Sequence, residues 1–364
     1  MLTAYNPLKQ NSDFMKNWYI LLLLSAILCA FNHSGSKKFI SADNRNIALI
    51  GRFDLSDRTN PVFMYSGSVI RTIFKGTSIE VILKDDSLRN MFNVIIDDSM
   101  FALTASKPDG SYRLASYLED TKHSLEIYRR TEWHGGNTTF KGFIIDKGKR
   151  LYKPQVKERV IEFIGDSYTC GYGNEGKSRE EHFTYETENN YLSYGAVTSR
   201  ALNAEYQTVC RSGIGMWQGY GGDPAFTMPK LYDQVIINSA TPWNFKRSQP
   251  HTVVIDLGGN DFSAALDSTA FGNTYIEFLK RIRNNYRSAE IVCIAGPDSP
   301  GEEFDKWRSY IHSVVNKFEK TDTKVNYFEF SPFEPNGSDW HPNVAEHQRM
   351  AEELVPFLKD LMKW

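Results

Sequence analysis

The chain has 364 residues, of which 41% are hydrophobic and 13% aromatic, enough for about two domains with sizeable cores. Its 42 basic and 44 acidic residues leave a net charge of −2, so neither nucleic acid nor an anionic membrane surface is expected as a main partner. No Cys-x-x-Cys, His-Glu-x-x-His or calcium-loop pattern occurs in the sequence. We therefore expect no metal and no cofactor.

The N-terminus has the pattern of a secretion signal. Lys16 precedes an apolar run, Trp18–Ala30, that is too short for a transmembrane helix. Met15 could be the true start, which would make the preceding residues an upstream extension. We predict that residues 1–36 are this signal peptide with its extension. The protein would then be secreted or periplasmic, without a transmembrane segment after processing, or a lipoprotein anchored through Cys29.

Short apolar runs separated by turn residues fill the part of the chain from about residue 40 to residue 155. The runs are Ile47–Ile50, Ser68–Phe74, Ser78–Leu83, Phe92–Ile96, His123–Tyr128 and Phe140–Ile145. This spacing is typical of an all-β sandwich. We predict a jelly-roll domain over residues 37–155.

After Lys157 the pattern changes to strands that alternate with helices. We predict strands at Val160–Ile164, Ala204–Val209, His251–Leu257, Glu290–Ala295 and Lys324–Glu329, and helices near Tyr191–Ala201, Thr274–Asn285, Phe304–Lys320 and Val344–Met362. Such alternation implies a parallel sheet in a three-layer α/β/α domain, here over residues 156–364. In parallel sheets of this kind the active site lies beyond the carboxyl ends of the strands.

Four short segments stand where such a site would form. Ile164–Thr169, Arg211–Gly215 and Leu257–Asp261 each follow a predicted strand, and Asp339–Pro342 lies just before the last helix. They supply a serine, small or amide residues, and a histidine with a nearby carboxylate. Acyl transfer needs these parts: a nucleophile, a base, a group that orients the base, and donors for the oxyanion.

Ser167, His341 and Asp339 are the candidate catalytic residues. Ser167 stands at a strand-to-helix turn, where it would either point into the crevice as the nucleophile or cap the helix. His341, held by the following Pro342, is the candidate base. Asp339 could accept a hydrogen bond from the Nδ1 of this histidine, or serve as a turn or capping residue.

The candidate oxyanion donors are the N–H groups of Ser167 and Gly213 and the side-chain amide of Asn260. Alternatively, Gly213 is a turn glycine and Asn260 forms an Asx turn. Trp217, Tyr220 and Trp340 are candidate substrate-binding residues, because aromatic faces stack on sugar rings. Core packing is the alternative for the first two.

The four segments resemble the blocks of the SGNH (GDSL-like) hydrolases over roughly residues 158–364. The matching residues are Gly165-Asp166-Ser167, Gly213, Gly259-Asn260-Asp261 and His341. A narrower resemblance is to carbohydrate esterase family 2, of the acetyl xylan esterase type. It is carried by Gly165–Gly173 and Asp339–Pro342, and upstream by Gly51-Arg52-Phe53, Gly67-Ser68 and Phe74–Thr77.

This resemblance implies a flavodoxin-like α/β esterase domain behind a β-sandwich. It implies a secreted serine esterase that removes O-acetyl groups from plant polysaccharides such as xylan and glucomannan, or from sugars derived from them. The wider superfamily has an aspartate three residues before its histidine, where this chain has Ser338, and some family 2 members work as a Ser–His dyad. The alternatives are an SGNH lipase or thioesterase acting on acyl chains, and a non-catalytic carbohydrate-binding protein.

Overall fold

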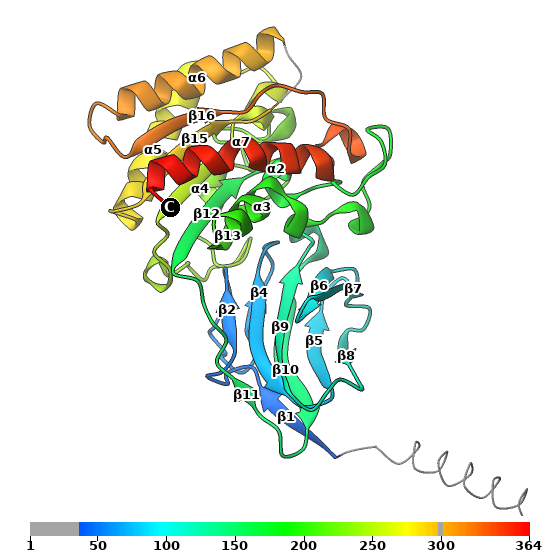
Figure 1. Ribbon diagram of the computed structural model, residues 1–364. Helices are drawn as coiled ribbons and strands as arrows, with labels where there is room; N and C mark the ends of the chain where they lie inside the picture. Colours follow the sequence, from blue (N-terminus) through cyan, green and yellow to red (C-terminus); the bar gives the residue numbers. More distant parts are fainter. Residues whose placement is uncertain (1–35, 298–300) are drawn as a thin grey trace, which may run out of the picture.

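The computed structural model describes residues 36–297 and 301–364, which form a β-sandwich followed by an α/β domain (Figure 1). The predicted signal peptide, with Met15 and Cys29, lies outside the described residues. None of the described helices is long and apolar enough to cross a membrane.

Two antiparallel sheets make up the N-terminal part. The first has the strand order β1 (Lys37–Ser41), β10 (Thr138–Asp146), β5 (Ile79–Asp85) and β8 (Asp109–Ala115), with β3 (Val62–Phe63) also paired to β10. The second has the order β11 (Leu151–Tyr152), β4 (Val69–Lys75), β9 (Lys122–Arg129), β6 (Met91–Ile96) and β7 (Ser99–Thr104), with β2 (Ala48–Ile50) paired to β4.

A hydrophobic core joins the two sheets, as in a sandwich. Ile70 and Phe74 of β4 share one buried cluster with Val81 and Leu83 of β5. Because side chains alternate along a strand, this pattern buries one face of each sheet. The sandwich prediction is confirmed, and each of the six predicted runs is a strand. Five strands, β1, β3, β7, β8 and β11, were not predicted. The side chains of β7, for example, are mostly exposed and show no alternation.

The second part contains a five-stranded parallel sheet. Its order is β13 (Ala204–Cys210), β12 (Arg159–Gly165), β14 (Thr252–Asp256), β15 (Glu290–Ala295) and β16 (Val325–Glu329). Numbered from β12, this is the 2-1-3-4-5 order of flavodoxin-like folds, whose binding crevice lies where the strand order reverses, between the first and third strands. Here that point is the carboxyl edge of β12 and β14.

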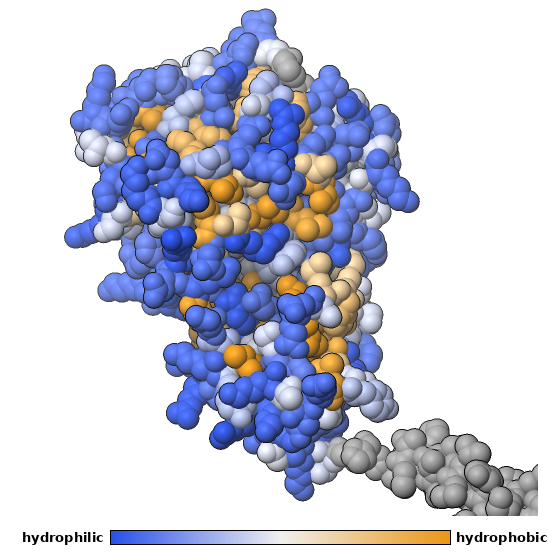
Figure 2. Space-filling view, in the orientation of Figure 1, coloured by the Kyte–Doolittle hydropathy of each residue, from blue (hydrophilic) through white to orange (hydrophobic). Residues whose placement is uncertain are grey.

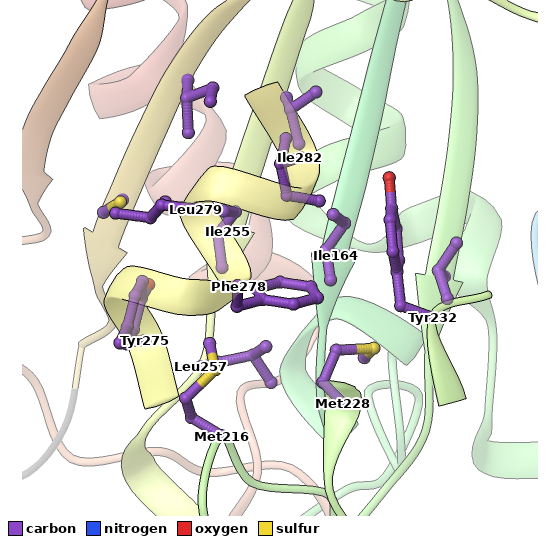
Figure 3. Packing of buried hydrophobic residues seen from close by; sticks show 14 of the residues in the cluster. Ile164, Met216, Met228, Tyr232, Ile255, Leu257, Tyr275, Phe278, Leu279 and Ile282 are labelled. Atoms are coloured by element: carbon purple, nitrogen blue, oxygen red, sulfur yellow. The ribbon is translucent and has the colours of Figure 1, made fainter. Parts of the chain in front are cut away.

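Helices cover both faces of this sheet, which confirms the predicted three layers. Helices α3 (Tyr194–Ala201) and α7 (Val344–Met362) share a core with one face, and α5 (Ser268–Asn285) and α6 (Glu302–Phe318) share a core with the other (Figure 1). Figure 3 shows Phe278 and Leu279 of α5 beside Ile255 of β14. Helix α5 begins earlier than predicted, because the Asp267 side chain caps it.

Shorter helices fill the loops around the sheet. They are α2 (Ser167–Cys170), α4 (Met228–Leu231), and the 3-10 turns η1 (Trp133–Gly135), η2 (Tyr185–Thr187), η3 (Asn190–Leu192), η4 (Tyr220–Gly222), η5 (Phe245–Arg247), η6 (Gly259–Ser263) and η7 (Ser338–Trp340).

The sandwich and the α/β domain share buried contacts. Arg52 of the sandwich is 2% exposed and lies 3.6 Å from the Glu162 carboxyl group of β12. The Tyr128 hydroxyl of the sandwich donates to Asn190 Oδ1 of the α/β domain at 2.7 Å. These contacts show that the two parts are packed together and not merely tethered.

The face of the molecule that Figure 2 shows is mainly hydrophilic, with hydrophobic side chains in small groups.

Candidate active site

Ser167 lies at a sharp turn between β12 and α2. A Cβ on Gly165 would come within 2.0 Å of Thr169 Oγ1, so the turn has no room for a side chain there. The side chain of Asp166 accepts from the Tyr168 N–H at 3.1 Å and caps α2. Ser167 is thus the first helical residue, and the capping alternative for it does not apply. Its side chain is 7% exposed.

Two backbone N–H groups at this edge of the sheet, among the described residues, make no hydrogen bond within the protein. Within the described part of the chain, the N–H groups of Ser167 and Gly213 have no hydrogen-bond partner. Gly213 follows β13 and has a φ of 77°, a left-handed conformation that favours glycine. Its carbonyl accepts from the Tyr220 N–H at 2.9 Å, which fixes the turn.

Asn260 joins three of the four segments. It follows β14, and its Nδ2 lies 3.0 Å from Asp166 Oδ2 and 2.9 Å from the Ile214 carbonyl oxygen. These acceptors belong to the residues next to Ser167 and Gly213. The ends of β12, β13 and β14 therefore meet at one point, as the sequence predicted, but both acceptors of the Asn260 amide belong to the protein.

His341, which directly follows η7, lies close to the turn that contains Ser167. Its ring centroid lies 5.6 Å from that of Tyr168, the residue after Ser167, and 4.4 Å from that of Tyr172. The histidine Nδ1 lies 2.9 Å from the main-chain oxygen of Asp339. Burial lowers the pKa of His341 below its usual value, against the smaller opposing effect of this hydrogen bond.

The carboxylate oxygens of Asp339 contact groups other than the His341 ring. They lie 2.8 Å from the Phe183 N–H nitrogen, 3.1 Å from the Tyr172 hydroxyl and 2.9 Å from His182 Nδ1. Burial opposes ionisation, but these hydrogen bonds outweigh it and lower the pKa of Asp339. The backbone oxygen of Asp339 thus contacts the His341 ring, while its side chain holds the turn together.

That turn is conformationally strained. Asp339 and Trp340 have φ values of 50° and 63°, although neither is a glycine. Such residues cost free energy unless their surroundings hold them in place, and they concentrate at functional sites. Here the Asp339 N–H donates to the Glu181 carbonyl at 2.9 Å, and the His341 N–H donates to the Ser338 carbonyl at 3.2 Å.

The three candidate aromatic residues differ in exposure. Tyr220 is 72% and Trp340 58% exposed, and the Arg179 guanidinium lies 4.6 Å from the centre of the Trp340 ring. Trp217 is half-buried and packs against the core of the α/β domain. The core-packing alternative therefore describes Trp217 better, while Tyr220 and Trp340 present their rings to solvent.

Asp261 is a structural residue of the site whose role was not predicted. Its carboxyl group accepts the N–H groups of Met216, Trp217 and Gln218 at 2.7, 2.7 and 2.9 Å, and so holds the chain that follows Gly213. Burial raises the pKa of Asp261 to about 6 in spite of these three donors. The sequence placed Asp261 in the third segment but gave no signal for which backbone it would bind.

Two acids, the half-buried Asp166 and the buried Asp256, lie at the ends of β12 and β14. Burial first, and the neighbouring Asp256 second, raise the pKa of Asp166 well above its usual value. Burial also raises the pKa of Asp256 to about 7, although its Oδ2 accepts from the Tyr194 hydroxyl at 2.9 Å. Among the described residues, no cluster of three or more histidine, cysteine or acidic side chains could hold a metal ion.

Comparison with known proteins decides the family. Residues 49–154 match the family model for the carbohydrate esterase 2 N-terminal domain, and residues 163–349 match that of the GDSL-like lipase/acylhydrolase family. The chain is 30% identical to an acetylxylan esterase / glucomannan deacetylase of Cellvibrio japonicus, over 96% of this chain and 100% of that protein. The chain belongs to carbohydrate esterase family 2. It is a carboxylic ester hydrolase, as predicted.

Two further relatives support this membership of family 2. Cellulase/esterase CelE of Acetivibrio thermocellus is 40% identical over 88% of this chain, but the match spans only 40% of the length of CelE. A family two carbohydrate esterase from Clostridium thermocellum, solved in complex with cellohexaose, is 39% identical with a TM-score of 0.82. That match covers 87% of this chain and 99% of the solved one.

Proposed function

We propose that the protein is an exported serine esterase that removes O-acetyl groups from plant polysaccharides such as xylan and glucomannan, or from their oligosaccharides. The Cellvibrio japonicus relative, which aligns over its whole length, carries the name of that activity. The apolar run Trp18–Ala30 supports export, and a lipid anchor on Cys29 is the alternative to release.

In this proposal Ser167 is the nucleophile and His341 the base. A carbonyl oxygen can only accept, so the contact with the Asp339 backbone requires the proton of His341 to sit on Nδ1. The lone pair of Nε2 is then free to take the proton of Ser167 Oγ as this oxygen attacks the acetyl carbonyl. The lowered pKa keeps the imidazole neutral and ready to accept.

The developing oxyanion would be held by the unpartnered N–H groups of Ser167 and Gly213. The Asn260 amide is the third proposed donor, for which the substrate oxygen would compete with the Ile214 carbonyl. His341 then returns the proton to the leaving sugar oxygen, which breaks the ester bond. A water molecule, deprotonated by His341, attacks the acetyl-enzyme and releases acetate.

Tyr220 and Trp340 are proposed to stack on the sugar rings. Their exposed rings suit a pyranose face, which binds to aromatic surfaces without demanding one stereochemistry. The Clostridium thermocellum relative was solved with cellohexaose, which supports an open cleft for a chain of sugars. Trp217 is a weaker candidate, because it packs against the core.

The observation that carries the proposal is the contact of the Asn260 amide with the neighbours of both Ser167 and Gly213. Acetate release from acetylated xylan, acetylated glucomannan and acetylated monosaccharides, measured side by side for the wild type and Ser167→Ala, tests it. We expect polysaccharide deacetylation that Ser167→Ala abolishes. Faster hydrolysis of nitrophenyl octanoate than of nitrophenyl acetate would instead favour the lipase alternative.

A further inference from the structure

Glu132 of the β-sandwich reaches into the esterase site. It follows β9, precedes η1 and is 1% exposed. Its Oε2 accepts from the Ser212 N–H at 2.7 Å, and its Oε1 accepts from the Ser212 hydroxyl. Ser212 immediately precedes Gly213, so one carboxyl group from the other domain binds the turn that carries a proposed oxyanion donor.

The same carboxyl group also contacts the nucleophile turn. The Cys170 thiol donates to Glu132 Oε2 at 3.4 Å, and Cys170 is the last residue of α2, whose first residue is Ser167. Glu132 thus contacts both short segments that carry the unpartnered N–H groups of Ser167 and Gly213. One carboxyl group that belongs to neither segment therefore links the two.

The next residue of the sandwich holds the turn from another side. The guanidinium of Arg211, just before Ser212, lies 4.1 Å from the ring centre of Trp133 and 3.8 Å from that of Phe226. Glu132 and Trp133 therefore fix two consecutive residues of the α/β domain. A left-handed glycine next to them, with a φ of 77°, has no side chain to fix its own direction.

We infer that Glu132 is a positioning residue for the oxyanion site and that the sandwich domain is thereby part of the catalytic centre. The inference rests on the proposed role of the Gly213 N–H. Donors of this kind act only when they are preorganised toward the transition-state oxygen, so a loosened turn raises the barrier more than it weakens substrate binding. Loss of Glu132 should therefore lower kcat and leave KM nearly unchanged.

The test compares Glu132→Ala, Glu132→Gln and Ser212→Ala with a matched control, Glu162→Gln. Glu162 is also a buried carboxyl group at the domain junction, but its partners are Arg52 and Tyr232, which do not belong to the Gly213 turn. We measure kcat and KM for nitrophenyl acetate, the inhibition constant of phenylboronic acid, which forms a tetrahedral adduct on a nucleophilic serine, and the thermal midpoint of each variant.

For Glu132→Ala we expect a fall in kcat of about 10²-fold, of the size found when one oxyanion donor is lost, and a parallel weakening of boronic acid binding. Glu132→Gln, which keeps one acceptor oxygen, should lie between this variant and the wild type. Once Glu132 is removed, Ser212→Ala should add little, because both substitutions break one interaction. Glu162→Gln should lower the thermal midpoint without lowering kcat.

Unchanged kcat and boronic acid binding in Glu132→Gln and Ser212→Ala would overturn the inference, even if Glu132→Ala does not fold. So would a strictly additive double variant, or an equal loss of kcat in Glu162→Gln. Ser167→Ala separates the two claims. If it retains activity, the proposed function fails; if it is inactive while the Glu132 variants match the wild type, only the inference fails.

Discussion

Replacing Asp339 distinguishes a backbone-oriented histidine from a Ser–His–Asp triad. In a triad, removing the carboxylate while keeping its shape lowers kcat by about 10⁴-fold. Here His341 Nδ1 contacts the backbone oxygen of Asp339 at 2.9 Å, and Asp339→Asn keeps that oxygen. Asparagine also tolerates the left-handed φ of 50° at this position. We therefore expect Asp339→Asn to retain kcat within about 10-fold, or about 1.4 kcal/mol in the barrier.

Alanine at the same position should act mainly through stability. It removes the acceptors of the Phe183 N–H and the Tyr172 hydroxyl, each worth about 1 kcal/mol, and adds about 1 kcal/mol of left-handed strain. We expect Asp339→Ala to lower the free energy of unfolding by about 3 kcal/mol. The assay is nitrophenyl acetate hydrolysis with urea unfolding on the same samples, and His341→Ala is the inactive reference. A loss of 10³-fold or more in a stable Asp339→Asn would refute the reasoning.

Other predictions follow from the same contacts. Asn260→Ala should lower kcat by about 10²–10³-fold, measured as acetate release; a loss below threefold would remove Asn260 from the oxyanion site. Gly213→Ala should lower kcat and cost about 1–2 kcal/mol of stability, because alanine resists a φ of 77°; an active, equally stable variant would contradict this. Because burial lowers the pKa of His341 from 6.5, the acid limb of the profile of kcat/KM against pH should have its midpoint below 6.5, and a midpoint above that value would be incompatible with the neutral base. Burial raises the pKa of Asp256 from 3.8 to about 7 in the folded protein, so the folded state loses stability as the pH rises through this window. The free energy of unfolding in urea should therefore change less between about pH 5 and about pH 8 for Asp256→Asn than for the wild type. An equal change in both proteins would exclude the effect.

The sequence predicted those parts of the fold in which apolar side chains alternate along strands or strands alternate with helices. The buried runs around Phe74 and Val81 predicted the sandwich, and the strands before Ser167 and Asn260 predicted the parallel sheet. Parallel strands end at one edge, so residues that follow them meet without further information. This is why three of the four candidate segments could be placed together from their order alone.

Contacts that depend on a single backbone angle could not be predicted in this way. The left-handed turn at Asp339 and Trp340 determines whether the side chain or the carbonyl of Asp339 faces the histidine. No local sequence pattern predicts this turn. Glu132 was missed for another reason. It lies 80 residues from Ser212 in the chain, in a region predicted as a separate domain, and a buried carboxyl group leaves no periodic signal.

In the proposed mechanism one hydroxyl, that of Ser167, attacks the ester with the help of His341. Covalent labelling tests it most directly: the enzyme is treated with a fluorophosphonate, digested, and the modified residue is located by mass spectrometry. We expect a single adduct on Ser167, formed much more slowly in His341→Ala and absent in Ser167→Ala. An adduct on another residue, or unchanged ester hydrolysis by an enzyme fully labelled at Ser167, would contradict it.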